Sequence, residues 1–152
     1  MALHTHPQLK RRSIVAASAL VVVQPVFALP DDLAAAILAH TKGQQVSAGK
    51  VTLDIATLVE NGNTVPLTVT VDSPMTAKEH VLSIALFNER NPQREVAHFF
   101  LGPRAGRASV ATRIRLATSQ KLVAIARTSD GAFWSASANV VVAMAACLEG
   151  DD

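Results

Sequence analysis

Apolar and polar residues alternate with a period of two over most of the chain, which is the pattern of half-buried β-strands. Val51, Leu53 and Ile55 alternate with polar or small residues, and the apolar positions of residues 65–71 do the same after a turn at residues 61–63. Further runs of this kind cover residues 81–88, 95–101, 109–117, 122–128 and 133–142. Asn91-Pro92, Gly102-Pro103 and Asp130-Gly131 separate these runs, and an Asp-Gly pair is a strong signal for a two-residue hairpin. About seven short strands without alternating helices predict an all-β fold, an immunoglobulin-like antiparallel β-sandwich.

One segment before the strands has a helical pattern instead. Asp31 and Asp32 stand where the start of a helix favours acids, and an apolar stripe follows at Leu33, Ile37 and Leu38. We expect a short amphipathic helix that ends near Gly43. Residues 29–142 are therefore predicted to form one domain, a helix plus a sandwich, and residues 143–152 a C-terminal arm.

Residues 1–28 have the composition of an export signal. Lys10, Arg11 and Arg12 precede an apolar run over residues 14–27, and Val26-Phe27-Ala28 offers small residues at the positions that a signal peptidase reads. The run is short for a membrane span, so we expect cleavage after Ala28, with no membrane attachment of the mature chain. The arginine pair resembles a twin-arginine signal, and an ordinary Sec leader remains the alternative. Both routes predict a periplasmic protein.

The net charge changes sign once the leader is removed. The full chain of 152 residues has 14 Lys and Arg against 12 Asp and Glu, a net charge of +2. The leader carries three of the basic residues and none of the acids, so the mature chain is close to −1. A basic surface for nucleic acid is therefore not expected.

The chain contains a single cysteine, Cys147, close to its C-terminus. In an oxidising compartment cysteines normally pair, and a lone cysteine cannot form an internal disulfide. Its position after the last predicted strand places the thiol on the arm rather than in the core, since five extended residues from Val142 span at most about 17 Å. A reachable thiol on a tether suits a covalent carrier.

Sequence motifs for an enzyme are missing. The chain has no G-x-S-x-G and no glycine-rich phosphate loop. After the leader only His40, His80 and His98 remain, and none has metal-ligand spacing to another His, Cys or Asp. We therefore expect no catalytic residues, no cofactor and no metal. Arg113 and Arg115 with Arg104 and Arg107 are read as a solvated strand face rather than an anion site.

Several blocks together resemble the SoxY family. These blocks are Val65 to Thr76, Phe87 through Asn91-Pro92, Ala111 to Ala117, Ser129-Asp130-Gly131, and a cysteine on a terminal arm. The resemblance implies a periplasmic sulfur carrier of bacterial thiosulfate oxidation, an immunoglobulin-like sandwich that pairs with a SoxZ subunit. It also implies that the arm cysteine holds the sulfur intermediate covalently while cytochromes and other periplasmic enzymes act on it, and that the carrier itself is not catalytic.

The arm departs from the usual Gly-Gly-Cys-Gly-Gly ending of that family. Here Ala145-Ala146-Cys147-Leu148-Glu149-Gly150 is similar to the SoxY-related proteins with an Ala-Ala-Cys-Ile-Glu arm. Alanine and leucine are more restricted than glycine, so this arm is stiffer and bulkier. Glu149 and the two terminal aspartates disfavour a thiolate and an anionic cargo.

Two other functions stay open on the sequence. One is an immunoglobulin-like periplasmic interaction module whose cysteine is incidental or forms an intermolecular disulfide. The other is a redox or metal-thiolate protein, although the sequence offers it neither a resolving cysteine nor a cluster of ligands.

Overall fold

The structure is a computed structural model that describes residues 32–144. The predicted export signal, residues 1–28, and Cys147 with its flanking residues lie outside this range. The described elements, in chain order, are α1 (Asp32–Thr41), β1 (Val46–Ala48), β2 (Val51–Ile55), β3 (Leu58–Asn61), β4 (Val65–Val71), β5 (Val81–Asn88), β6 (Glu95–Phe100), η1 (Pro103–Ala105), β7 (Ala108–Ile114), β8 (Gln120–Thr128) and β9 (Phe133–Met144).

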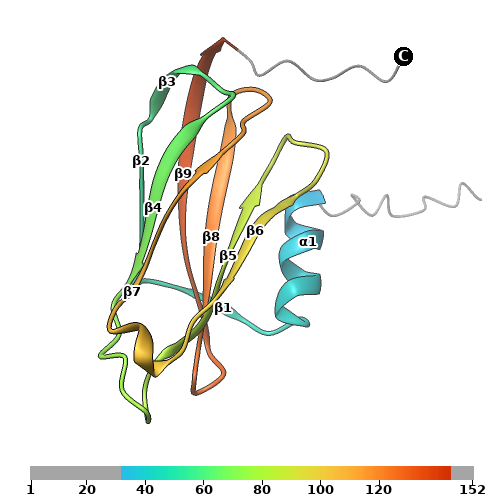
Figure 1. Cartoon of the computed structure of the whole chain (residues 1–152). Coiled ribbons are helices and arrows are strands. Elements are labelled where there is room, and N and C mark those ends of the chain that lie inside the picture. Colours follow the sequence, from blue (N-terminus) through green and yellow to red (C-terminus); the bar gives the residue numbers. More distant parts are fainter. Residues whose placement is uncertain (1–31, 145–152) are drawn as a thin grey trace, which may run out of the picture.

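These strands form two sheets that pack face to face (Figure 1). The larger sheet has the order β1-β9-β8-β5-β6, with β3 also paired to β9, and the smaller has the order β2-β4-β7. The predicted all-β sandwich is confirmed. Seven of the nine strands of residues 32–144 match predicted runs, and β1 and β3 were missed. Both are too short, at three and four residues, for a period of two to be recognised.

The two missed strands are also the ones that pair in parallel. β1 pairs with the first residues of β9, and β3 pairs with its last residues, from Leu58 opposite Val141 to Asn61 opposite Met144. The other pairings among the described strands are antiparallel. β9 therefore continues to Met144, two residues beyond the predicted end of the strand, because β3 supplies partners for it there.

The sandwich core is built from the alternating apolar positions that the sequence shows. In β4, Val65, Leu67, Val69 and Val71 are buried while the residues between them are half-buried or exposed. They pack against residues of β5, β8 and β9 in the larger sheet, among them Ile84, Leu86 and Leu122. Each such side chain contributes roughly 1.5–3 kcal/mol when it leaves water.

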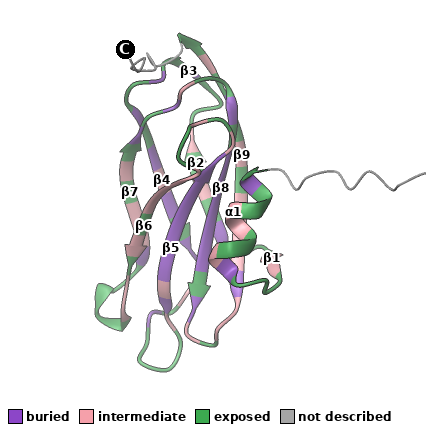
Figure 2. Cartoon of the chain, turned by 90° about the vertical axis from the view of Figure 1, so that its right-hand side faces the viewer, coloured by how far each residue is buried: buried purple, intermediate pink, exposed green. Residues whose placement is uncertain are grey.

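Buried and exposed residues do not alternate along β5 and β8, because both strands are covered on both faces. Figure 2 shows both strands as almost continuously buried, with α1 lying over the face that points away from the smaller sheet. A second apolar cluster fills this space and contains Leu33, Ala85, Phe87, Val123, Ile125 and Phe133. The helix thus adds a third layer to part of the sandwich.

The predicted helix is confirmed, but its buried stripe is only partly as expected. Leu33 is buried and Ile37 packs against the second cluster, whereas Leu38 is 59% exposed. At 3.6 residues per turn, Leu38 lies well over a quarter-turn from Leu33, while His40 returns to the Leu33 side. The face that meets the sheet is therefore completed by His40 and by Thr41, which is buried.

The helix ends where predicted. Lys42 and Gly43 have φ values of 54° and 76°, and the Gly43 amide donates to the Leu38 carbonyl at 2.9 Å. This is a common way to satisfy the last carbonyl groups of a helix, and glycine adopts the left-handed conformation without steric cost.

The predicted hairpin between β8 and β9 is found at Asp130-Gly131, but its loop is longer than two residues, because the Thr128 amide donates to the Ala132 carbonyl at 3.0 Å and residues 129–132 lie outside both strands. Gly131 has a φ of 88°, and the Asp130 carboxylate accepts from the Thr128 hydroxyl and from the Ala132 amide. These hydrogen bonds, that of Thr128 first, lower the pKa of Asp130 below its ordinary value of 3.8. A carboxyl with a lowered folded-state pKa stabilises the fold above its unfolded pKa, and this contribution is lost as the pH falls through the folded value.

Thr128→Val is expected to raise the pKa of Asp130 towards its ordinary value, because valine has the shape of threonine without the hydroxyl donor. A pH titration of the Asp130 carboxyl carbon by NMR measures this shift. Equal pKa values in the variant and the parent would show that the Thr128 hydroxyl does not stabilise the carboxylate.

Candidate functional site

The predicted site residues are Cys147 and its neighbours Ala145, Ala146, Leu148, Glu149 and Gly150, and they lie outside the described residues. The described chain stops three residues before the cysteine, at the end of β9. We use the name arm root for the residues of β3 and β9 that meet there: Leu58, Asn61, Val141 and Met144.

The arm root is held firmly by main-chain hydrogen bonds. The Val141 amide donates to the Thr57 carbonyl at 2.8 Å, and the Gly62 amide donates to the Met144 carbonyl at 3.2 Å. Between them, the Val142 amide donates to the Ser119 hydroxyl at 2.9 Å. Whatever follows Met144 thus starts from a fixed point at one end of the sandwich.

Three apolar side chains of the arm root are exposed. Leu58 is 64% exposed, Val141 54% and Met144 62%. Leu58 and Val141 are register partners, so they share one face of the sheet, whereas Val59 and Val142 point inward from the next pair. Met144 has the parity of Val142 and lies on the other face, so only Leu58 and Val141 form an exposed apolar pair. Neighbouring apolar side chains at a surface are typical of interaction sites.

The structure also brings together residues that sequence spacing left apart. His40 at the end of α1 and His98 on β6 lie on either side of Glu95. His40 Nδ1 is 3.5 Å from one carboxylate oxygen of Glu95, and His98 Nδ1 is 3.3 Å from the other. Sequence spacing did not reveal this cluster, because Glu95 was not among the residue types considered and because His40, far away in the sequence, joins Glu95 and His98 only after α1 packs on the sheet.

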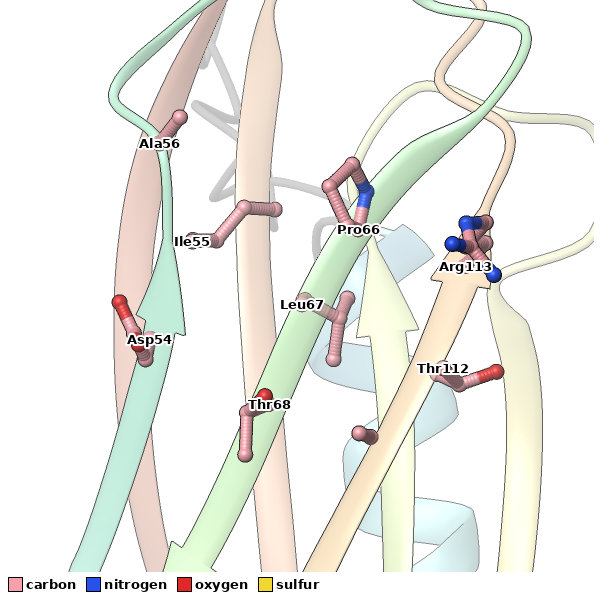
Figure 3. A pocket seen from close by; sticks show the side chains of 9 residues that line it. Asp54, Ile55, Ala56, Pro66, Leu67, Thr68, Thr112 and Arg113 are labelled. Carbon is pink, nitrogen blue, oxygen red and sulfur yellow. The ribbon is translucent and has the colours of Figure 1, made fainter.

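The arginines considered in the sequence do not gather. Arg104 and Arg107 precede β7, whereas Arg113 and Arg115 lie at its other end, about 20 Å away at roughly 3.3 Å per residue. Arg113 lines a shallow groove on the smaller sheet together with Asp54, Pro66 and Thr68 (Figure 3). The groove therefore combines both signs of charge, and only one of the four arginines lines it.

No helix in residues 32–144 has the length and apolar character needed to cross a membrane.

The family model of the sulfur oxidation protein SoxY matches residues 36–147. Among solved structures, the sulfur carrier protein SoxY from Chlorobium limicola f thiosulfatophilum is 27% identical with a TM-score of 0.60, over 71% of this chain and 89% of that chain. No curated protein matches the sequence.

Other solved structures share the fold at lower identity. A superoxide reductase (neelaredoxin) from Ignicoccus hospitalis is 19% identical with a TM-score of 0.55, covering 61% of this chain and 79% of that one. The superoxide reductase from Nanoarchaeum equitans is 13% identical with a TM-score of 0.54, covering 63% and 100%. These matches describe the architecture of the sandwich and nothing about chemistry.

Proposed function

The chain belongs to the SoxY family of sulfur oxidation proteins, and from this premise we propose that it is a sulfur carrier that holds its cargo covalently on Cys147. The observation that carries the proposal is the extent of the family match, which runs through the sandwich and ends at Cys147. The anchored arm root, three residues before the thiol, supports it. It gives the tether a rigid base from which the thiol is presented.

The proposed attachment needs no catalytic residue of the carrier. When the Cys147 thiolate forms an S–S bond with the outer sulfur of a thiosulfate-like donor, two electrons leave the pair of sulfur atoms. A partner cytochrome accepts them. Hydrolysis by a partner enzyme then breaks the bond between the outer sulfur and the sulfonate group, which leaves as sulfate with an oxygen from water, and a persulfide remains on Cys147 for the next step. Activation of the thiol, which the nearby acids disfavour, then falls to the partner enzymes.

We place this carrier in the periplasm, paired with a SoxZ-like subunit and served by sulfur-oxidising periplasmic enzymes and cytochromes. Family membership supports a place within a sulfur oxidation system. The leader at residues 1–28 supports export, by the twin-arginine or the Sec route. The Ala-Ala-Cys-Leu-Glu arm favours partners with a wider or differently charged channel than a glycine arm requires.

Mass spectrometry of the protein from cells grown on reduced sulfur tests the proposal, with Cys147→Ser as the comparison. A sulfur adduct on Cys147 that reducing agents remove is the expected result. A covalent homodimer on a non-reducing gel, abolished by the same substitution and without any adduct, would instead identify an interaction module.

The arm root is where partner enzymes must approach the thiol, so Leu58→Glu is expected to slow sulfur loading in cells. An exposed apolar residue that contributes about 1.4 kcal/mol to docking corresponds to a roughly tenfold effect. The fraction of protein carrying an adduct at early times, by mass spectrometry, measures it.

Leu38→Glu is the matched control, because Leu38 is similarly exposed, at 59%, but lies on α1. Both variants are expected to keep their thermal stability, since neither side chain is buried. Equal loading of the Leu58 and Leu38 variants would rule out docking at the arm root.

A further inference from the structure

We propose that His40, Glu95 and His98 form a binding site for a divalent transition-metal ion, for which Zn²⁺ is the best-suited probe. Two imidazoles and one carboxylate are a donor set that zinc accepts, with a fourth position left for water or another ligand. This site goes beyond the proposed carrier function and involves none of the residues of the cysteine arm.

Both separations between a histidine nitrogen and the Glu95 carboxylate match the spacing of ligands around a single ion. Zinc binds nitrogen at about 2.0–2.1 Å and carboxylate oxygen at about 2.0–2.2 Å, so tetrahedral neighbours lie about 3.3–3.5 Å apart. His40 Nδ1 and His98 Nδ1 lie 3.5 and 3.3 Å from different oxygens of Glu95, and one ligand atom from each of the three residues lies within 4.8 Å of the others. Binding one ion draws the widest pair of ligand atoms closer together. Both separations exceed the roughly 2.7–2.9 Å of a direct charge-assisted hydrogen bond.

A β-bulge in β6 places two of the donors on one face. Residues i and i+3 of a regular strand point to opposite faces, so Glu95 and His98 would normally diverge. Here Leu86 of β5 pairs with Ala97 and Phe87 pairs with Glu95, which leaves Val96 as the extra residue. A bulge re-aims the side chains that follow it, and bulges are frequent beside functional sites.

The third donor comes from the helix layer. His40 lies one and two turns after Ile37 and Leu33, so the same face of α1 that packs on the sheet directs the imidazole towards β6. The His40 ring is 5.1 Å from the His98 ring, centre to centre. A metal ion bound here would tie the end of α1 to β6.

Aromatic residues surround both histidines. Phe87 and Phe133 approach the His40 ring edge-on at 5.2 and 6.2 Å, and Phe100 stacks on His98 at 4.4 Å. Ring contacts of this kind hold the orientation of imidazole ligands. The side chains of His40, His98 and Glu95 are 12%, 29% and 39% exposed, so an ion can enter from solvent.

Cys147 is too far away to be the fourth ligand in the same molecule. Through the register of the larger sheet His98 lies level with Ser135 of β9, nine residues before Met144. That is about 30 Å at roughly 3.3 Å per residue. The three residues from Met144 to Cys147 span at most about 11 Å. The proposed metal site and the carrier thiol are therefore separate in one chain.

The test is a zinc titration of the protein produced from the full-length chain, purified without a histidine tag and freed of metal by a chelator. Isothermal titration calorimetry is expected to show one Zn²⁺ per chain, and excess zinc to raise the Tm by several degrees. His98→Ala and Glu95→Gln should weaken binding by more than about 100-fold, beyond the 10–100-fold typical of residues that only support ligands. Both side chains are partly exposed, so these variants should fold.

Two control variants identify the site. His80→Ala removes a histidine whose Nδ1 contacts the Thr76 carbonyl, and it should leave zinc binding unchanged. Cys147→Ser should also leave it unchanged. The proposal is overturned if the parent chain binds no stoichiometric zinc, if His98→Ala and Glu95→Gln bind as the parent does, or if Cys147→Ser abolishes binding.

Discussion

Cys147→Ser is expected to abolish every covalent sulfur adduct on the protein, because the chain then contains no thiol at all. In cells grown on thiosulfate, the parent protein should show one or more added masses that a reductant removes, and the variant only its unmodified mass. Thiosulfate oxidation that depends on this carrier should fall to background. Whole-protein mass spectrometry and the rate of thiosulfate consumption measure the two effects.

The variant should fold as the parent does. Cys147 lies three residues beyond Met144, past the last main-chain hydrogen bonds of the arm root. The Tm of the Cys147→Ser variant is therefore expected to match that of the parent, which separates loss of function from loss of structure. An adduct that persists in the variant, or thiosulfate consumption at the parent rate, would refute the carrier role of Cys147.

Phe87→Ala is expected to destabilise the domain by about 3–5 kcal/mol, the range for truncating a buried phenylalanine. Phe87 is fully buried between β5 and α1, in the second apolar cluster. Domains of this size have free energies of unfolding of only about 5–15 kcal/mol, so the variant should be close to the limit of folding. Urea denaturation followed by tryptophan fluorescence measures the difference, since the chain has one tryptophan, Trp134.

Phe100→Ala is the matched control on the neighbouring strand. Phe100 is 81% exposed, so its truncation should change the free energy of unfolding by no more than about 0.5 kcal/mol. If the two substitutions cost the same, the helix layer does not bury Phe87 in solution. The comparison therefore tests the packing of α1 on the larger sheet, on which the proposed metal site also depends.

Measuring the stability of the parent and of Phe87→Ala again in the presence of zinc connects the packing of α1 with the proposed metal site. His40 contacts Phe87 edge-on, and Phe87 opposes Glu95 in the sheet register. Loss of the ring removes support from two of the three metal donors at once. Zinc should consequently stabilise the parent more than it stabilises the Phe87 variant.

Much of the secondary structure was predictable because it depends on local patterns. β4 at Val65–Val71 and the turn at Asp130-Gly131 are found where they were predicted, since alternation and turn residues act within a few positions, although the hairpin loop is longer than two residues. Leu38 was assigned to the wrong face of α1 because an apolar residue beside a stripe is easily counted with it. β1 and β3 were missed because their evidence lies in β9, far away in the sequence.

One of the two candidate sites could be predicted from the sequence and the other could not. Cys147 is identifiable from the sequence alone, since it is the single thiol, lies near the end of the chain and follows the last strand. The His40, Glu95 and His98 cluster is not, because two long-range events create it. β6 must acquire its bulge against β5, and α1 must pack across the strands.

The sequence by itself therefore determined the β-sandwich class, the helix, the hairpin, the resemblance to SoxY and the lone thiol. Each of these depends on residue types and spacings within a short stretch of chain. Only the tertiary structure decided which strands are covered on both faces, where β9 is anchored before Met144, and which histidines meet. Those features arise from pairing and packing between distant segments, and their energies are not visible in any local pattern.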